Sequence, residues 1–300
     1  MSPDNAKTSD DECKIRIGGF CCSLRFKDPD FTASARNHYR GFLSEDDPDL
    51  TIDVNLVPHE GSIHIPNSIL ISKTVDGDNF NYHSGLLTGT LSLDEKQCTI
   101  DVKNALLHGR CVRIFEQFLF QVYYTLLKEK DPKKARNNYM IHGCAVSKDG
   151  YGYLFSGPSE SGKSTIARLS SDLNLDILND ELVIIDRNDG DYSIESSPFR
   201  GDFTDNCNGL VPLRAIFLIR HGKKNTIRKI SATEFVTRFV REVIYSDTVL
   251  SVNSKGTLSE MMDFSADLAE NVKYYELQFL PDTSFWESIE DLNMVQEVCE

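Results

Sequence analysis

The nine residues from Gly157 to Thr165, with the sequence GPSESGKST, restrict the folds open to this chain more than any other segment. They match the pattern G-x-x-x-x-G-K-[ST], in which backbone N–H groups close around a chain of phosphates. Residues 151–156 before the run have the apolar character of a strand, and residues 165–169 after it begin a helical pattern. The pattern requires this setting, because a helix N-terminus adds its dipole to an anion site. The sequence therefore predicts an α/β nucleotide-binding unit.

The pattern also predicts what each part of the loop contacts. Lys163 is expected to reach the outer phosphates, and the Ser164 hydroxyl is expected to bind Mg²⁺. ATP and Mg²⁺ are the expected cofactors, with GTP and pyrophosphate as alternative phosphoryl donors. A structural turn that contains Gly-Lys-Ser by accident is the alternative interpretation. The residues expected to line the nucleotide are Gly157, Pro158, Ser159, Glu160, Ser161, Gly162, Lys163, Ser164 and Thr165.

The acidic composition limits the classes of partner. The formal net charge is −14, whereas nucleic acids and anionic membranes favour basic surfaces. The sequence therefore argues against both as partners, but not against a nucleotide, which a few local donors can hold. No run approaches the ~20 apolar residues of a membrane-spanning helix, and residues 1–12 lack the apolar core of a signal peptide. We expect a cytoplasmic protein whose eight cysteines, without C-x-x-C spacing, are free thiols.

The chain is predicted to have two domains after a polar tail. Short segments that alternate apolar and polar residues, such as residues 50–56 and 98–102, indicate a mainly antiparallel β region. A helix with apolar residues at three- and four-residue steps over residues 112–126 follows, and it bridges to the next domain. The predicted divisions are a disordered tail over 1–12, a β-rich region with its bridging helix over 13–135, and a P-loop domain over 136–300.

The second domain is predicted to alternate strands and helices. The sequence favours a helix over residues 232–245, where apolar residues recur in helical register, and a short helix from Thr283 capped by Asp282. The predicted strands cover residues 139–146, 151–156, 175–178, 182–185, 192–194, 213–219 and 274–279.

A triphosphate site also needs carboxylates, and Asp180 and Glu181 are the candidates. They lie between two predicted strands, and Asp180 is 17 positions beyond Lys163, with one predicted helix between. The alternative is a solvated acidic turn. His142 interrupts an apolar strand, a pattern that by itself is typical of a core histidine. Arg200 lies in a loop within reach of this site, where it is either a surface residue or a cation that neutralises charge on a transferred phosphoryl group.

Together these residues resemble the catalytic domain of HPr kinase/phosphorylase and related P-loop proteins. The resemblance covers roughly residues 139–219 and rests on the order and spacing of His142-Gly143, the loop, Asn179-Asp180-Glu181 and Arg200-Gly201. It implies an α/β fold similar to that of phosphoenolpyruvate carboxykinase, here preceded by the mainly antiparallel β (α+β) region. It further implies that Asp180 is the general base, that Glu181 helps to hold the metal, and that His142 assists these acids.

Three differences from that family bear on function. Asp180-Glu181 stands where Asp-Asp is usual, Glu160 stands where glycine is common, and residues 202–206 replace a glycine-rich substrate signature. Two functions are therefore kept. The first is a Mg²⁺-dependent kinase that transfers phosphate from ATP to a hydroxyl of a small molecule or serine, with Asp180, His142, Lys163 and Arg200 as catalytic residues. The second is a nucleotide-binding accessory or sensor protein with little transfer. The sequence does not decide between a monomer and a homo-oligomer.

Overall fold

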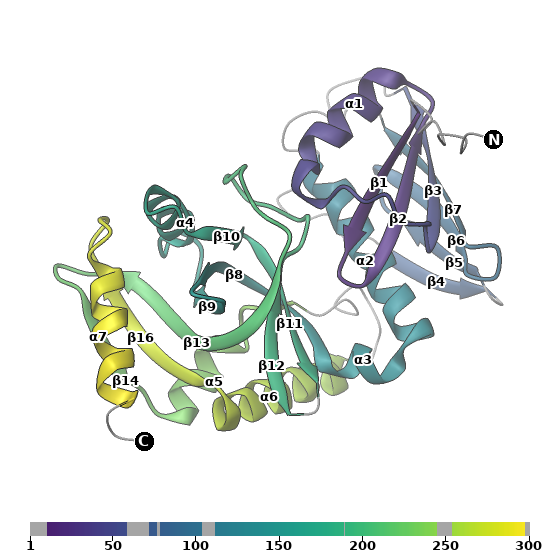
Figure 1. Cartoon of the computed structure of the whole chain (residues 1–300). Helices are drawn as coiled ribbons and strands as arrows, with labels where there is room; N and C mark the ends of the chain where they lie inside the picture. Colours follow the sequence, from purple (N-terminus) through teal and green to yellow (C-terminus); the bar gives the residue numbers. More distant parts are fainter. Residues whose placement is uncertain are drawn as a thin grey trace, which may run out of the picture. The chain divides into compact units, whose positions relative to one another are not determined.

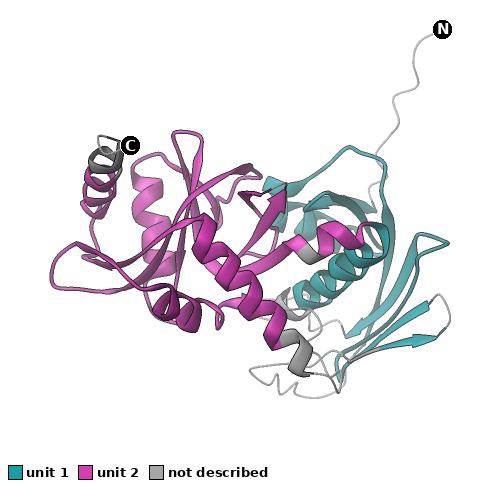
Figure 2. Cartoon of the chain, turned by 90° about the horizontal axis from the view of Figure 1, so that it is seen from below, with its two compact units in different colours: residues 1–130 teal, residues 131–300 magenta. Residues whose placement is uncertain are grey.

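The computed structural model describes residues 11–58, 72–76, 79–103, 112–188, 190–244 and 254–297. In this part of the chain the fold is mixed α/β, with one sheet of seven strands and one of nine (Figure 1). The chain divides into two compact units, residues 1–130 and residues 131–300 (Figure 2). Residues 1–10 of the predicted tail lie outside the described residues. Glu12, at the end of that predicted tail, is already the first residue of a strand.

The first unit contains a mixed sheet in the order β1-β2-β3-β7-β6-β5-β4. Antiparallel pairings predominate, as predicted, but β3 is parallel to both of its neighbours, β2 and β7. Its elements are β1 (Glu12–Ile17), β2 (Phe20–Phe26), α1 (Pro29–His38), the 3-10 helix η1 (Arg40–Phe42), β3 (Leu50–Val57), β4 (Ser72–Asp76), β5 (Asn79–His83), β6 (Leu87–Ser92), β7 (Gln97–Lys103) and α2 (Val112–Lys130).

The second unit contains the nine-stranded sheet, and every strand predicted for this part of the chain is present. Its strands are β8 (Asn138–Lys148), β9 (Tyr151–Ser156), β10 (Asp176–Asn179), β11 (Leu182–Asn188), β12 (Asp191–Glu195), β13 (Leu210–His221), β14 (Thr226–Lys229), β15 (Val243–Ile244) and β16 (Lys273–Phe279). Its helices are α3 (Pro132–Asn137), α4 (Lys163–Asp172), α5 (Ala232–Phe239), α6 (Ser254–Asn271) and α7 (Phe285–Glu297).

Five of these strands close into a ring. β8 pairs with β11, β11 with β12, β12 with β13, β13 with β9, and β9 again with β8. The closure is achieved because β8 pairs with β11 through its first half and with β9 through its second half. The strands β9, β13 and β16 are mutually parallel, so their carboxyl ends lie at one edge of the sheet.

Helices cover this sheet on both faces, which explains why its central strands are apolar throughout. Phe155 of β9 packs into a core with residues of α4 and α7, whereas its neighbour Leu154 packs into a second core with residues of α5 and α6. Strands buried on both faces lack the alternation of a half-exposed strand. None of the helices in the described ranges is both long and apolar enough to cross a membrane.

One predicted helix is shorter than expected. The helix predicted over residues 232–245 ends at Phe239, and Val243 and Ile244 form β15, which pairs with β8; Tyr245 lies outside the described residues. Val243 and Ile244 pair with β8 instead of continuing the helix. Both residues are β-branched, and β-branched residues favour strands. This correction matters for the site, because the strand brings Glu242 to the middle of β8.

Candidate functional site

The loop 157–162 connects the carboxyl end of β9 to the N-terminus of α4. Gly162 is the N-cap of α4 with φ of +107°, and a Cβ there would lie 2.5 Å from the ring carbon Cζ of Phe279. A Cβ on Gly157 would lie 3.1 Å from the carbonyl oxygen of Ile219. Glycine at both ends therefore allows the loop to pass close to β13 and β16, as a tight anion-binding loop requires.

Lys163, the first residue of α4, folds back over this loop. Its ammonium donates hydrogen bonds to the carbonyl oxygens of Gly157 at 2.7 Å and Pro158 at 3.2 Å, and the residue is only 7% exposed. Burial lowers the pKa of Lys163 below its usual value and outweighs the opposing charges of Glu242 and Glu181. An ammonium has three donors, so one remains for an anion within the loop.

The loop also contains a buried polar atom without a partner. The Oγ of Ser161 is enclosed and makes no hydrogen bond, although the residue is 7% exposed. No side chain caps α4 at Gly162, whereas Ser231 caps α5 through the backbone N–H of Glu234. A buried hydroxyl and an uncapped helix N-terminus at the same place suit an acceptor-rich ligand such as a phosphate. Ser164 and Glu160 are exposed and Thr165 is half-buried.

The replacement Ser161→Ala tests this interpretation. Without ligand, it removes an unsatisfied buried hydroxyl, so the free energy of unfolding should stay unchanged or rise by about 1 kcal/mol. The same replacement should weaken the binding of Mg·ATP, because the hydroxyl can then no longer donate to a phosphate. Chemical denaturation and calorimetry measure the two effects. Ser34→Ala, at an exposed position on α1 in the first unit, is the control for both. Lower stability together with unchanged affinity would show that the hydroxyl serves the fold alone.

The acidic pair lies one strand away from the loop. β10 and β11 follow each other along the same edge of β8, both antiparallel to it, with a register shift between Ile177 and Asn179. Asp180 and Glu181 fall between them, and the carbonyl oxygen of Glu181 accepts the N–H of Gly143 at 3.0 Å. On the opposite edge of β8, the same Gly143 pairs with Ser156, the last residue before the loop. The middle of β8 therefore separates the acidic pair from the loop by the width of one strand.

Asp180 is buried and holds the segment that contains Arg200. Its two carboxylate oxygens accept the backbone N–H groups of Gly201 at 2.9 Å and Phe203 at 3.1 Å, and the residue is 1% exposed. A Cβ on Gly201 would lie 2.8 Å from this carboxylate, so the approach requires glycine. Both oxygens of this carboxylate are therefore used by backbone donors. Asp180 thus fixes the middle of the loop between β12 and β13.

His142 lies between two glutamates. Its Nδ1 is 2.9 Å from a carboxylate oxygen of Glu242, and its Nε2 is 3.8 Å from a carboxylate oxygen of Glu181. The backbone N–H of His142 also donates to the carbonyl oxygen of Glu242 at 2.8 Å. Because the imidazole is about a quarter exposed and Glu242 is nearly buried, Glu242 orients the ring from the inside. His142 is therefore not a histidine satisfied within an apolar core.

The remaining predicted residues are more peripheral. Arg200 is half-buried, and its guanidinium donates to the carbonyl oxygen of Thr204 at 3.1 Å. Glu160 has φ of +66°, a backbone conformation that favours glycine, and its carbonyl oxygen lies 3.1 Å from Nε2 of His221. Sequence reasoning missed both Glu242 and His221. Neither residue belongs to a motif. Strand pairing brings Glu242 to His142 and His221 to the loop.

A divalent ion fits this site only together with phosphates. Within the described ranges, no group of three or more His, Cys, Asp or Glu side chains is arranged to hold a metal ion. Mg²⁺ at nucleotide sites is usually held by one or two carboxylates, a hydroxyl, waters and the phosphates themselves. Ser164 is exposed and the side chain of Glu181 is 35% exposed, so both are accessible for this role. The donor set is compatible with a metal–nucleotide complex and not with a closed metal cage.

A comparison with models of protein families finds a match that covers most of the second unit. A family model described as SynChlorMet cassette protein ScmC matches residues 110–294, a range that includes the loop, the acidic pair, His142 and Glu242. No curated protein matches the chain.

Proposed function

The chain belongs to the family of SynChlorMet cassette protein ScmC, and from the geometry of its second unit we propose that it is a Mg²⁺-dependent phosphotransferase. In this proposal the second unit is an HPr-kinase-like P-loop domain that binds ATP and transfers its terminal phosphate to a hydroxyl. The acceptor is a small molecule or a serine side chain. The observation that carries the proposal is that β8 holds the acidic pair on one edge and the loop with Lys163 on the other.

The residues near the loop would bind and orient the nucleotide. The backbone N–H groups of residues 162–164 and the ammonium of Lys163 would hold the phosphates, and the partner-free Ser161 hydroxyl would add a donor. Magnesium, when bound with the nucleotide through Ser164 and Glu181, supplies neutralisation of phosphate charge. The negative charges of Glu242, Glu181 and Asp180 also act on Lys163, so magnesium would offset carboxylate charge as well as phosphate charge.

In the transfer step, the acceptor oxygen forms a bond to the terminal phosphorus while the bond from that phosphorus to the bridging oxygen breaks, and ADP leaves with the electron pair. The hydroxyl proton passes to a carboxylate, for which we propose Asp180. Since Asp180 is bonded to Gly201 and Phe203, the acceptor reaches it only when the segment after Ser197 moves outward. Arg200 moves with this segment and would then face the transferred group.

The direct experiment measures binding and turnover in the same protein. Calorimetry with Mg·ATP should detect binding at micromolar to millimolar concentration, and terminally labelled ATP should lose its label to water or to an acceptor. Calorimetry with GTP and pyrophosphate would distinguish the donors. An absence of heat with all three ligands in the presence of Mg²⁺ would reject the proposed function.

Glu242 should act as a positioning residue through His142. Glu242→Ala removes the carboxylate that orients the imidazole, and we expect transfer to fall by about tenfold or more. Glu242→Gln keeps an acceptor for Nδ1 and should retain more activity than the alanine variant. Calorimetry should show Mg·ATP affinities within about twofold of each other for the two variants, because both remove the negative charge that acts on Lys163. Equal losses in kcat for both variants, or a loss confined to nucleotide affinity, would contradict the positioning role.

The second candidate, a nucleotide-binding accessory or sensor protein, is supported by the same site. Asp180 is 1% exposed, and both of its carboxylate oxygens accept backbone hydrogen bonds. The carboxylate therefore has a structural role that competes with a role as proton acceptor. Glu160 also places a non-glycine residue in a left-handed conformation within the loop. Tight binding of Mg·ATP without hydrolysis or transfer would favour this candidate.

A further inference from the structure

The acidic chain contains one strongly basic stretch. From Val211 to Arg241 it has eight Lys and Arg residues and one Glu, a surplus of seven positive charges in a protein whose net charge is −14. Nucleotide binding by the loop and Lys163 does not account for this reversal of sign. Charge concentrated on one segment attracts partners of the opposite charge.

Part of this stretch crosses the carboxyl ends of the parallel strands, beside the loop. We call residues 220–229 the basic crossover; they comprise the end of β13, the connection 222–225 across the end of β16, and β14. The N–H of Gly222 donates to the carbonyl oxygen of Phe279 at 3.0 Å, and Oδ1 of Asn225 accepts the N–H of Leu280 at 2.7 Å. His221, next to Arg220, contacts the carbonyl oxygen of Glu160 in the loop at 3.1 Å. In open α/β sheets, ligands bind outside this edge.

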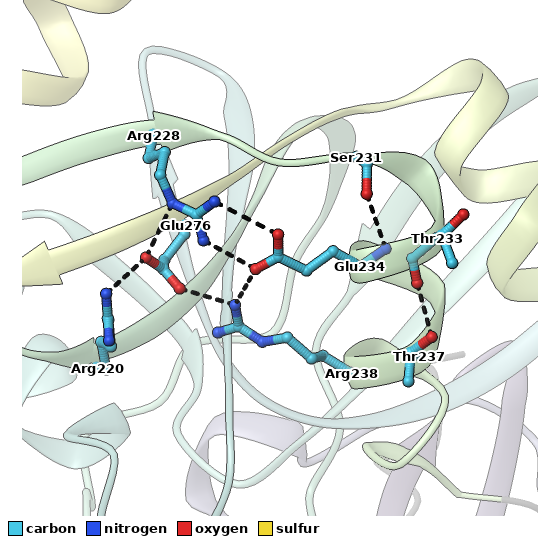
Figure 3. A network of polar contacts seen from close by, with 8 residues as sticks. All are labelled: Arg220, Arg228, Ser231, Thr233, Glu234, Thr237, Arg238 and Glu276. Atoms are coloured by element: carbon cyan, nitrogen blue, oxygen red, sulfur yellow. Dashed lines mark hydrogen bonds and ion pairs between the residues drawn. The ribbon is translucent and has the colours of Figure 1, made fainter.

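An ion-pair network holds the base of the basic crossover. Arg220, Arg228 and Arg238 converge on the buried carboxylate of Glu276, with N–O distances of 3.0, 3.3 and 2.8 Å (Figure 3). Arg228 and Arg238 also contact Glu234 at 2.8 and 3.1 Å (Figure 3). Three cations and two carboxylates leave one positive charge, and they connect β13, β14, β16 and α5. The basic crossover therefore rests on a preorganised base.

Three lysines of the basic crossover are not neutralised. Lys223, Lys224 and Lys229 are exposed, and their side chains make no ion pair or hydrogen bond with another described residue. Lysine on an edge strand commonly prevents pairing with other chains, and that explanation fits Lys229 on β14. It does not fit Lys223 and Lys224, which precede β14 and follow His221, the residue that contacts the loop. Their charge is free to attract a ligand.

We propose that the basic crossover is the docking surface for an acidic peptide segment, which brings a serine hydroxyl to the loop. The proposal rests on the proposed function for the role of the serine. A peptide fits better than a second nucleotide, because the exposed lysines form a row along the chain, from Lys223 and Lys224 before β14 to Lys229 at its end, which pairs with Tyr275. Several carboxylates of an extended peptide can match this row. A compact polyphosphate would contact only one end of that row.

The test uses the full chain and a short fluorescein-labelled peptide in which Asp and Glu alternate with Gly around one Ser. The variant Lys223→Glu/Lys224→Glu should bind it about tenfold or more weakly than the unmodified protein, measured by fluorescence anisotropy. Lys27→Glu/Lys133→Glu changes the net charge equally at exposed positions outside the second unit's sheet, and it should change the affinity by less than about twofold. The same peptide with Asn and Gln in place of the acids should bind neither variant nor the unmodified protein.

Several outcomes would overturn the docking surface. The first is that the acidic peptide does not bind to the unmodified protein. The second is that both double variants lose peptide affinity equally. The third is that Lys223→Glu/Lys224→Glu loses affinity for Mg·ATP but still binds the peptide. A protein that self-associates through the basic crossover, with the double variant monomeric in sedimentation and no peptide bound, would also overturn it. Peptide binding is measured without nucleotide. Failure of the calorimetry with Mg·ATP would therefore reject the phosphotransferase and leave this result standing.

Discussion

Replacement of Lys163 by alanine is expected to lower phosphoryl transfer by about 10²–10³-fold, the loss typical of one preorganised electrostatic donor. The ammonium lies within the loop, bonded to the carbonyl oxygens of Gly157 and Pro158, so it is already positioned before a phosphate arrives. Burial also lowers the pKa of Lys163, which means that the enclosed charge is poorly solvated. A bound polyphosphate would replace the interactions with water that the buried ammonium has lost. Lys163→Ala removes the ammonium and with it this stabilisation of the phosphates.

A second variant separates the charge from the packing of the side chain. Lys163→Met keeps the length and the apolar stem but not the ammonium, so its transfer rate should fall as far as that of Lys163→Ala. Lys133→Ala, at an exposed position on α3, is the control and should retain full activity. Transfer is measured with terminally labelled ATP and stability by thermal unfolding. Normal transfer by the folded methionine variant would show that the loop does not hold the reacting phosphates.

The elements that the sequence predicts well are those in which local pattern and tertiary structure agree. β9 covers residues 151–156, as predicted, because a strand buried on both faces has a continuous apolar run and ends at Gly157. The start of α4 was predictable from the glycine and lysine of the loop pattern. The helix α1 was not predicted, although Asp28 caps it and Pro29 occupies its first turn, both of which are local signals.

The part of the candidate site that depends on long-range pairing was not predictable. Glu242 follows a helical pattern in the sequence, yet hydrogen bonds to β8 turn this segment into a strand and place its carboxylate 2.9 Å from His142. The pairing of β10 and β11 with β8 places Asp180 and Glu181 between these two strands, where Asp180 is buried and Glu181 is partly exposed. Adjacent acids in a sequence look equivalent. Only the register against β8 distinguishes their surroundings.

Replacement of Asp180 by asparagine should abolish turnover while Mg·ATP still binds. Asparagine has nearly the same shape, but its amide offers one oxygen to two backbone donors, the N–H groups of Gly201 and Phe203. One of these groups loses its acceptor inside the protein, and we expect the free energy of unfolding to fall by about 1–3 kcal/mol. The acceptor hydroxyl also loses its proton acceptor, so transfer should disappear even under conditions where the variant is fully folded.

The stability effect and the turnover effect can be distinguished with a neighbouring variant. Gly201→Ala places a Cβ 2.8 Å from the carboxylate of Asp180, so it disturbs the same contact without removing the carboxylate. If Asp180 serves only to hold the loop, the two variants should lose activity and stability together, in equal proportion. If Asp180 accepts the proton, Gly201→Ala should retain measurable turnover at equal stability, whereas Asp180→Asn should not. Full turnover by Asp180→Asn would exclude it as the base and leave Glu181, paired with His142, as the partly exposed carboxylate able to take the proton.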